Sequence, residues 1–448
     1  MNDTTRMLTA GLAALLVGGF TAAALAQDAP RETRIITFDQ AIEIALQQND
    51  VLRSARNAAA LGELGVDQAR TDFLPDLGLS ARTSRDFDRD DTSQTTSLNL
   101  SSGVTLFDGF ANTAGLKAAK LASRASGADL ARTGETVIFT VATDFLALVQ
   151  SQEQLRVQRE NLAAQVALGK QIDAYVRAGA RTIADQYQQE ANVASAKLAV
   201  VEAERAAELA KVDVILTLQL DPRGTYEFVA PAVGQPGADA LEPLDALIAR
   251  AWAARADVAA GEARAEAALQ DIRVAKSGRW PVVGLSAGYG SSFSSDVAPS
   301  WNDQLDDNRG GAVGLTVTMP LYDRGATRIA TRRAELAADN AQIALDSLRQ
   351  QVGSQVRRAV LDLESAREQL LTSEAQQRAA ARALEVTEQR YRAGAATLVE
   401  LTQSRATQVQ AAGAYVTAKY EVEFQRRLLD YYVGGLTAER VRFEQAPD

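Results

Sequence analysis

Two long stretches without proline, residues 111–175 and 326–391, constrain the shape that this chain can adopt. Apolar side chains recur in both at intervals of seven residues, and a shift of 215 residues brings the two series into register. The matched pairs are Val141 with Val356, Leu148 with Leu363 and Leu155 with Leu370. Each stretch is predicted to form one helix of about 65 residues, which extends roughly 100 Å at ~1.5 Å per residue. A helix of this length with a seven-residue repeat packs sideways against similar helices, as in a coiled coil.

The two long helices belong to a larger repeat, because the second half of the chain is similar to the first. At a shift of 206 residues, 78–81 matches 284–287 and Pro75 matches Pro281; at a shift of 215 residues, 106–108 matches 321–323. Proline, glycine and aspartate recur in one order, which favours internal duplication over chance similarity between alanine-rich helices. The added residues fall in the predicted loop 291–310, where extra length is tolerated. Each half is predicted to contain a helix, two strands joined by a loop, a very long helix, a tight turn and a long helix.

The N-terminus is typical of a secretory signal. Arg6 precedes an apolar run that ends in Ala24-Leu25-Ala26, which predicts cleavage between Ala26 and Gln27. The alternative is a membrane anchor, which the many glycines and alanines of the run disfavour. We therefore expect a signal peptide at 1–26, a first repeat at 27–220, an inter-repeat segment at 221–243, a second repeat at 244–435 and a flexible tail at 436–448.

The sequence contains neither cysteine nor histidine. Their absence excludes disulfides, Cys/His zinc sites, thiol nucleophiles, imidazole catalysis and lipid anchoring through an acylated cysteine. Carboxylates are plentiful, but none lies in a recognisable catalytic pattern, so we expect no enzyme, no cofactor and no metal site. The formal net charge of −10 argues against a nucleic-acid partner, since phosphates would repel such a surface.

Four short segments alternate apolar residues with glycine, serine, threonine or asparagine. They are 77–83, 98–106, 283–289 and 313–319. This period of two is typical of transmembrane β-barrel strands, although a soluble sheet with one buried face would show the same alternation. No run after the signal is long enough for a spanning helix, so a membrane crossing would have to use these strands.

Four strands are too few to close a membrane barrel, because the smallest spanning barrels have about eight strands and an open edge leaves backbone groups unpaired in lipid. The chain is therefore expected to form a homotrimer with a 12-stranded outer-membrane β-barrel. The fold is then mainly α, with this small barrel continuous with a long periplasmic α-helical barrel of coiled-coil type. The proline- and glycine-rich segment 221–243 is predicted to form a belt around the middle of the tunnel. The aspartate-rich loops 87–96 and 291–310 are predicted to face the exterior.

With this plan in view, the chain resembles the outer membrane efflux protein family typified by TolC. The resemblance rests on the duplicated plan, the strand-to-helix sequence V-T-M-P-L-Y-D-R-G-A at 317–326 and the two R-A-G-A turns. It implies an outer-membrane export duct of a tripartite efflux or type I secretion system in a Gram-negative bacterium. It also implies a periplasmic adaptor (membrane fusion) protein and an inner-membrane ABC or RND transporter as partners, with outer-membrane lipid around the barrel. The alternative from another class is a soluble periplasmic coiled-coil scaffold or adaptor.

The two R-A-G-A turns have a plain local explanation. Gly179 and Gly394 permit the left-handed cap that ends a helix, and Thr182 and Thr397 are suited to begin the next one. The acidic residue three positions after each threonine is favoured by the helix dipole. The family resemblance implies a further role, in which these four residues lie at periplasmic tips that dock the adaptor and form a closed entrance.

The resemblance also assigns residues to that entrance. Glu400 matches a position of an acidic ring, whereas Gln403 departs from a second acidic position. Tyr391 and Asp185 match residues that tie inner to outer helices in the closed state. Ala396 stands where that lock has an arginine, which predicts either a weaker latch or its replacement by Arg181.

Overall fold

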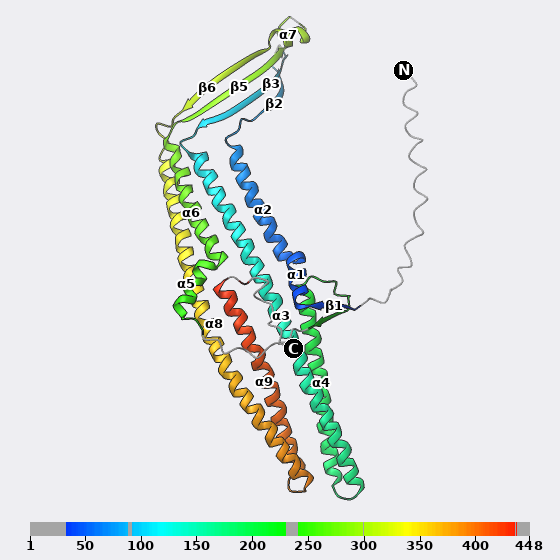
Figure 1. Cartoon of the computed structure of the whole chain (residues 1–448). Helices are drawn as coiled ribbons and strands as arrows, with labels where there is room; N and C mark the ends of the chain where they lie inside the picture. Colours follow the sequence, from blue (N-terminus) through cyan, green and yellow to red (C-terminus); the bar gives the residue numbers. More distant parts are fainter. Residues whose placement is uncertain (1–32, 88–91, 230–240, 299, 435, 437–448) are drawn as a thin grey trace, which may run out of the picture.

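The computed structural model describes residues 33–87, 92–229, 241–298, 300–434 and 436 (Figure 1). The molecule is elongated, with a small sheet at one end and two helical hairpins at the other. The predicted signal peptide 1–26, with its cleavage site at Ala26 and Gln27, lies outside the described residues. So do 88–91 of the first loop, 230–240 of the inter-repeat segment and nearly all of the tail.

The elements follow the same order in both halves, apart from one added helix. The first half contains β1 Arg34–Thr37, α1 Phe38–Gln48, α2 Asp50–Thr71, β2 Gly78–Phe87, β3 Thr92–Phe107, α3 Ala111–Arg177 and α4 Ile183–Thr217. The second contains β4 Tyr226–Val229, α5 Leu244–Ala254, α6 Ala256–Lys276, a 3-10 turn Ser277–Arg279, β5 Val282–Ser294, α7 Trp301–Asp307, β6 Gly310–Thr318, α8 Ala326–Arg392 and α9 Leu398–Val433.

The two very long helices are present as predicted. Helices α3 and α8 have 67 residues each and end within two residues of the predicted limits. Members of the seven-residue series are buried on both, including Val141 and Leu148 on α3 and Val356 and Leu363 on α8. No helix in the described part of the chain combines the length and the apolarity that a membrane span requires.

The helix predicted at the start of each half is two helices in the structure. The first break falls at Asn49, whose side-chain oxygen accepts hydrogen bonds from the backbone N–H groups of Val51 and Leu52 and so caps α2. The second falls at Arg255, between α5 and α6. The short helix α7 lies within the predicted loop 291–310 and was not expected.

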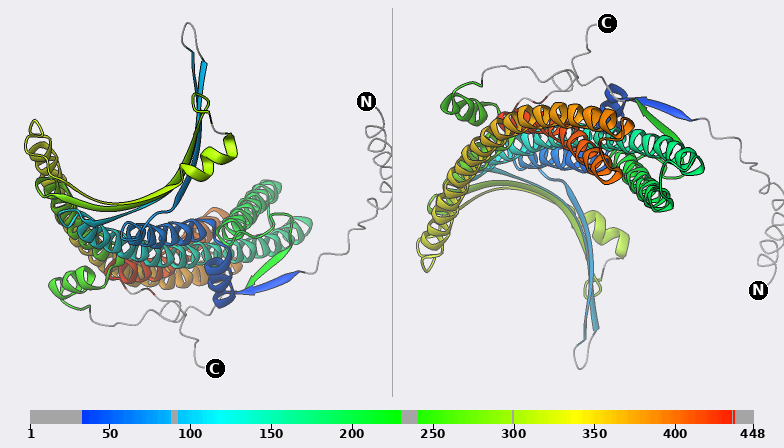
Figure 2. Two further views of the ribbon diagram at one scale, coloured as in Figure 1. Left: turned by 90° about the horizontal axis from the view of Figure 1, so that it is seen from above. Right: turned by 90° about the horizontal axis from the view of Figure 1, so that it is seen from below.

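The four predicted strands form one antiparallel sheet in the order β2-β3-β5-β6, and each is longer than predicted. The register aligns their alternation across the sheet. Apolar rows include Leu79-Leu100-Tyr289 and Val104-Leu285-Leu315. Rows of small or polar residues include Gly78-Ser101-Gly288 and Thr105-Gly284-Thr316. The sheet is strongly curved, as the two end views show (Figure 2).

A second, two-stranded sheet lies at the middle of the molecule. Strand β1 pairs in parallel with β4, which comes from the inter-repeat segment. Ile36 of β1 and Phe228 of β4 are buried in a cluster with residues of α1, α3 and α4. Helix α5 of the second half lies across the width of the helical layer from this sheet, on the convex side of the curved layer (Figure 2).

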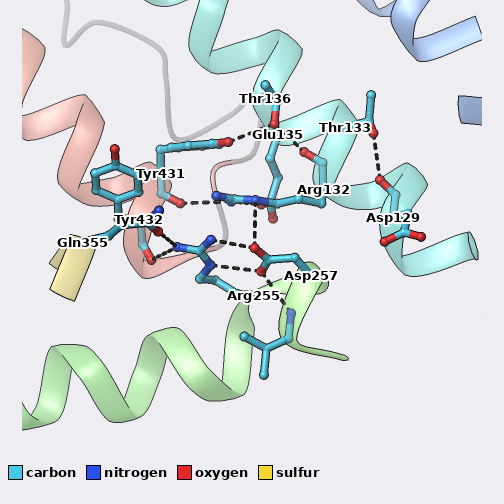
Figure 3. A network of polar contacts seen from close by, with 11 residues as sticks. Asp129, Arg132, Thr133, Glu135, Thr136, Arg255, Asp257, Gln355, Tyr431 and Tyr432 are labelled. Atoms are coloured by element: carbon cyan, nitrogen blue, oxygen red, sulfur yellow. Dashed lines mark hydrogen bonds and ion pairs between the residues drawn. The ribbon is translucent and has the colours of Figure 1, made fainter. Parts of the chain in front are cut away.

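Three charged residues join the helices at this middle level, and we call Arg132, Arg255 and Asp257 the equatorial clamp (Figure 3). Arg255 is almost fully buried and forms two hydrogen bonds with the Asp257 carboxylate, the shorter at 2.6 Å. Its guanidinium also donates to the Gln355 side chain at 2.9 Å and to the Tyr432 carbonyl at 3.3 Å. Residues of α6, α8 and α9 are thereby held around one side chain.

Arg132 extends the clamp to α3. Its guanidinium lies 3.9 Å from the centre of the Tyr431 ring, donates to the Tyr431 carbonyl at 3.1 Å and lies 3.8 Å from Asp257. Burial opposes ionisation of Asp257, but the hydrogen bonds and charge of Arg255, with Arg132, lower the pKa of that carboxyl below its usual value. Both arginines therefore face a carboxylate that stays ionised.

Candidate functional site

The two R-A-G-A turns lie together at the end of the molecule farthest from the sheet (Figure 1). Gly179, after α3, and Gly394, after α8, have φ values of 72° and 74°. In each turn the next residue donates its backbone N–H to a carbonyl five residues earlier, Ala180 to Tyr175 and Ala395 to Arg390, both at 2.8 Å. These are the bonds of a left-handed helix cap, in which glycine avoids the penalty of a side chain.

The helices that leave the turns begin as the sequence predicts. The Thr182 hydroxyl accepts from the Asp185 N–H at 3.2 Å, while the Asp185 carboxylate accepts from the Thr182 N–H at 3.2 Å. In the second turn the Thr397 hydroxyl accepts from the Glu400 N–H at 3.2 Å and donates to the Glu400 carboxylate at 3.3 Å. The glycine and threonine caps therefore account for the backbone conformation of both turns.

The two hairpins meet through a small apolar cluster, which we call the tip cluster. It contains Leu168, Ile172, Tyr391, Ala396, Leu398 and Leu401, the first two from α3 and the others from the second hairpin. Tyr391 is 3% exposed, and its hydroxyl oxygen is buried without a hydrogen bond to any described residue. Ala396 is buried in the same cluster.

Arg181 of the first turn reaches across to the second hairpin. Its guanidinium carbon lies 4.5 Å from the centre of the Tyr391 ring, a cation–π contact. Burial raises the pKa of Tyr391, Arg181 opposes the rise and Asp185 adds to it, so this phenol is neutral at ordinary pH. The structure therefore brings Arg181 and Tyr391 together, with Asp185 near enough to act on the phenol electrostatically.

Asp185 and the two remaining predicted residues have other partners. The Asp185 carboxylate is hydrogen-bonded to the Thr182 hydroxyl and N–H within its own turn. The Glu400 carboxylate lies 3.4 Å from the Arg390 guanidinium at the end of α8, and both side chains are about half exposed. Gln403 is exposed one turn farther along α9. Within one chain, neither Glu400 nor Gln403 joins the contact between Arg181 and Tyr391.

Sequence reasoning missed a buried amide network above the tips. Gln189 of α4 is 1% exposed and donates to the Gln165 side chain of α3 at 2.8 Å. Asn192 of α4 donates to the Gln189 side chain and to the Thr402 hydroxyl of α9, each at 3.3 Å. A signal was available, because Gln165 occupies a position three residues before Leu168 and seven before Ile172 on one apolar face.

The sequence model of the family described as "Outer membrane efflux protein" matches residues 41–217 and 247–435. Protein CyaE of Bordetella pertussis is 28% identical over 346 residues, which cover 73% of this chain and 69% of CyaE. The pyoverdine export outer membrane protein OpmQ of Pseudomonas putida is 24% identical over 391 residues, covering 84% of this chain and 80% of OpmQ.

The fold is also similar to a solved structure, that of the outer membrane protein VceC of Vibrio cholerae. The TM-score is 0.75 at 20% identity, and the alignment covers 89% of this chain and 96% of VceC. With this coverage, the similarity concerns the fold of most of the chain.

Proposed function

The chain belongs to the outer membrane efflux protein family and is an outer-membrane efflux channel of a Gram-negative bacterium, and from this premise we propose that three copies form one passive duct. The duct runs from the periplasm to the exterior and performs transport without a reaction of its own. We further propose that an inner-membrane ABC or RND transporter drives export through it, by way of a periplasmic adaptor.

The proposal of a trimer rests on the two unpaired edges of the four-stranded sheet. Among the described residues β2 and β6 each have one neighbouring strand, so each leaves one edge unpaired. The apolar rows are exposed as well, with Leu79 71% and Val313 77% exposed. Backbone groups at an open edge are costly in lipid, and a spanning barrel needs about eight strands or more. Three copies supply twelve strands and pair every edge.

A cysteine cross-link between neighbouring chains tests this proposal. The chain has no cysteine of its own, so Ser80→Cys in β2 can be combined in turn with Gly314→Cys, Thr316→Cys or Thr318→Cys in β6. Within one chain β2 and β6 are three strand spacings apart, roughly 14 Å, which is too far for a disulfide. We expect at least one pair to give covalent trimers in denaturing gels.

The outcomes separate the two classes of function. Covalent trimers in the membrane fraction support the duct. A monodisperse monomer in detergent-free buffer, with no cross-linked species for any pair, would contradict it and favour a soluble periplasmic scaffold. A ladder that stops at dimers would exclude the threefold barrel.

The proposed adaptor site is at the tips. Helices α3 and α8 place the turns roughly 100 Å below the sheet, on the side from which an inner-membrane partner would approach. Next to the caps Thr182 and Thr397, the apolar side chains of Ile183 and Val399 are 60% and 72% exposed. We expect Ile183→Asp with Val399→Asp to abolish copurification of a cross-linked adaptor and transporter, while exposed Leu209→Asp on α4, away from the tips, leaves it intact.

We also propose that Glu400 forms an acidic ring where three chains converge at the entrance. Like charges in a narrow ring attract and hold cations. Trivalent cations added from the periplasmic side should block conductance in a planar bilayer, and Glu400→Gln should raise the blocking concentration roughly tenfold. Because Arg390 compensates part of this charge, Arg390→Gln should strengthen the block. Exposed Glu385→Gln is the control, and an unchanged block in Glu400→Gln would refute the ring.

The last part of the proposal is that contacts between the hairpins hold the entrance closed. Asp185 keeps the first turn in place and adds negative charge beside Arg181. Asp185→Ala is expected to make cells more permeable to a bulky antibiotic, whereas Asp173→Ala, on the exposed side of α3, is not. Equal uptake in both variants would show that Asp185 has no part in closure.

A further inference from the structure

A hollow of about 400 Å³ lies where the helices meet the sheet, and we call it the junction hollow. Its walls come from the first two turns of α3 and from the last turns of α6 with the segment that follows. The lining includes Phe110, Lys117, Gln270, Arg273, Lys276 and Trp280. It therefore combines three cationic side chains with two aromatic rings.

The junction hollow opens on the convex side of the helical layer. Helix α5 lies on that side (Figure 2), and its Trp252 donates to the Arg349 carbonyl at 3.1 Å. The Arg349 guanidinium bonds to Glu262 of α6 at 2.7 Å, so Glu262 also lies toward that side. Glu266, one turn farther along α6, pairs with Lys117 at 3.8 Å. The residues of α6 that line the hollow continue the same helical face.

The cationic groups of the junction hollow are largely uncompensated. Arg273 and Lys276 are exposed and form no ion pair with a described residue; Arg273 donates only to the Gln270 side chain, at 3.2 Å. Gln270 is 4% exposed, so its buried side chain forms one polar wall of the junction hollow. Lys117 has a single long ion pair with a half-exposed glutamate. An anion that enters would meet two free positive charges.

The backbone shapes the hollow. Phe110 precedes α3 with φ of 69°, and the Asp108 carboxylate caps this helix by accepting a hydrogen bond from the Asn112 N–H at 2.6 Å. Gly109 allows the close approach of α3 to α6, because a Cβ there would lie 2.7 Å from the Cβ of Trp280. The Phe110 and Trp280 rings are 62% and 54% exposed, and Phe110 packs edge-on against Phe107, the last residue of β3.

The position of the junction hollow relative to the membrane identifies the kind of anion. Strand β3 ends at Phe107 and β5 begins at Val282, so the hollow lies just beyond the strands. If the strands span the outer membrane, as the proposed function holds, the hollow lies at the periplasmic surface of the bilayer, among phosphate headgroups. Aromatic rings are common at such an interface, and basic pockets there bind anionic headgroups.

We propose that the junction hollow binds the phosphate headgroup of an anionic glycerophospholipid from the periplasmic leaflet. Lys276 and Arg273 bind the phosphate, and Trp280 and Phe110 lie against the glycerol and the first methylenes of the acyl chains. The bound lipid seals the joint between barrel and helices on its lipid-facing side. This inference rests on the proposed orientation of the strands and adds a ligand that the duct itself does not require.

The test measures lipid bound to the full-length protein in detergent. Native mass spectrometry during titration with phosphatidylglycerol should show one tightly bound lipid per chain, with phosphatidylcholine bound more weakly. The double variant Arg273→Gln with Lys276→Gln should lower the affinity for phosphatidylglycerol about 25-fold, since each basic residue contributes roughly fivefold. Arg382→Gln is the matched control, since it removes an exposed arginine far down α8 that forms no ion pair with a described residue.

Three results would overturn the proposal. One is an unchanged affinity for phosphatidylglycerol in the double variant. Another is equal binding of the zwitterionic and anionic lipids. The third is competition by millimolar inorganic phosphate together with no effect of Trp280→Ala, which would make the hollow a simple anion site. The cysteine cross-link described above is read on the same samples, so a failed trimer and a failed lipid site are distinguished.

Discussion

The middle of the molecule and its tips are both places where the two halves of the chain touch, but they are held in different ways. At the middle, Arg132 of the first half donates to the Tyr431 carbonyl and lies 3.8 Å from Asp257, which buried Arg255 holds by charged hydrogen bonds (Figure 3). At the tips, a cluster of six residues and one cation–π contact join the hairpins. Separating the two halves at the tips would therefore break few contacts, whereas separating them at the middle would break many. The equatorial clamp is expected to stay fixed while the tips move.

The largest effect on this difference between middle and tips is expected from removal of Arg255, the central residue of the equatorial clamp. Arg255→Ala leaves Asp257 and two polar groups without their partner, and we expect a loss of about 3 kcal/mol in the free energy of unfolding. Arg264→Ala removes an exposed pair with Asp129 and should cost less than about 1 kcal/mol. Denaturant unfolding in detergent measures both. Equal losses would show that the middle has no special rigidity.

Glycine substitutions compare the two regions with one chemical change. Gly434, after α9, has φ of 86° and ψ of 155°, and a Cβ there would lie 3.1 Å from the Arg255 backbone nitrogen. Gly394 at the tip has φ of 74°, with open space around it. We expect Gly434→Ala to cost roughly 2–3 kcal/mol and Gly394→Ala about 1 kcal/mol. The same unfolding assay measures both losses of stability. A larger loss for Gly394→Ala than for Gly434→Ala would contradict the comparison.

Acid should weaken the middle before it affects the contact at the tips. The pKa of Asp257 is lower in the folded state, so its contribution is complete above the ordinary aspartate pKa of about 3.9 and is lost as the pH falls through the lower folded value. Arg255→Ala should abolish this part of the pH dependence. Unfolding curves between about pH 6 and pH 3 test this, and a variant with the same acid dependence as the parent chain would refute the assignment.

At the tips the expected effects on stability are small and those on closure are large. Arg181→Ala removes the cation–π contact, worth about 1 kcal/mol, and should increase basal conductance in a planar bilayer. Arg177→Ala, which removes an exposed pair within α3, is the control. If both variants conduct alike, Arg181 does not hold the hairpins together.

The smallest effect is expected from a substitution that keeps the ring of Tyr391 and removes its hydroxyl. Tyr391→Phe keeps the ring under Arg181 and removes a buried hydroxyl that forms no hydrogen bond with a described residue, so stability should stay equal or rise by about 1 kcal/mol. Basal conductance should not increase. A leaky Tyr391→Phe channel would show that closure depends on the hydroxyl.

The sequence predicts those parts of the fold that have a periodic signal over many residues. The seven-residue series locates α3 and α8 within two residues, and the alternation locates all four strands of the larger sheet. It does not reveal the pairing of β1 with β4, because strands of four residues, about 190 positions apart, carry no local pattern. The breaks at Asn49 and Arg255 are missed for a related reason, since each is a single residue with an extended backbone between two helices.

The candidate site shows the same limit. The turns follow from local chemistry, because Gly179, Thr182, Gly394 and Thr397 shape the backbone within a few residues. The approach of Arg181 to Tyr391 joins positions 210 residues apart, and only the packing of two hairpins brings it about. Sequence spacing alone therefore left two outcomes open for Arg181, and the junction hollow between α3 and α6 had no sequence signal at all.

The equal length of α3 and α8, 67 residues each, acts as a molecular ruler. A lengthened α3 without a matching change in α8 would push one tip past the other, and a change other than a multiple of seven would rotate the buried face away from its neighbours. Variation in the reach of such ducts is then expected to occur in paired steps of seven residues, about 10 Å each. The number of seven-residue repeats in these helices would thus correspond to the distance that the duct has to cover across the compartment.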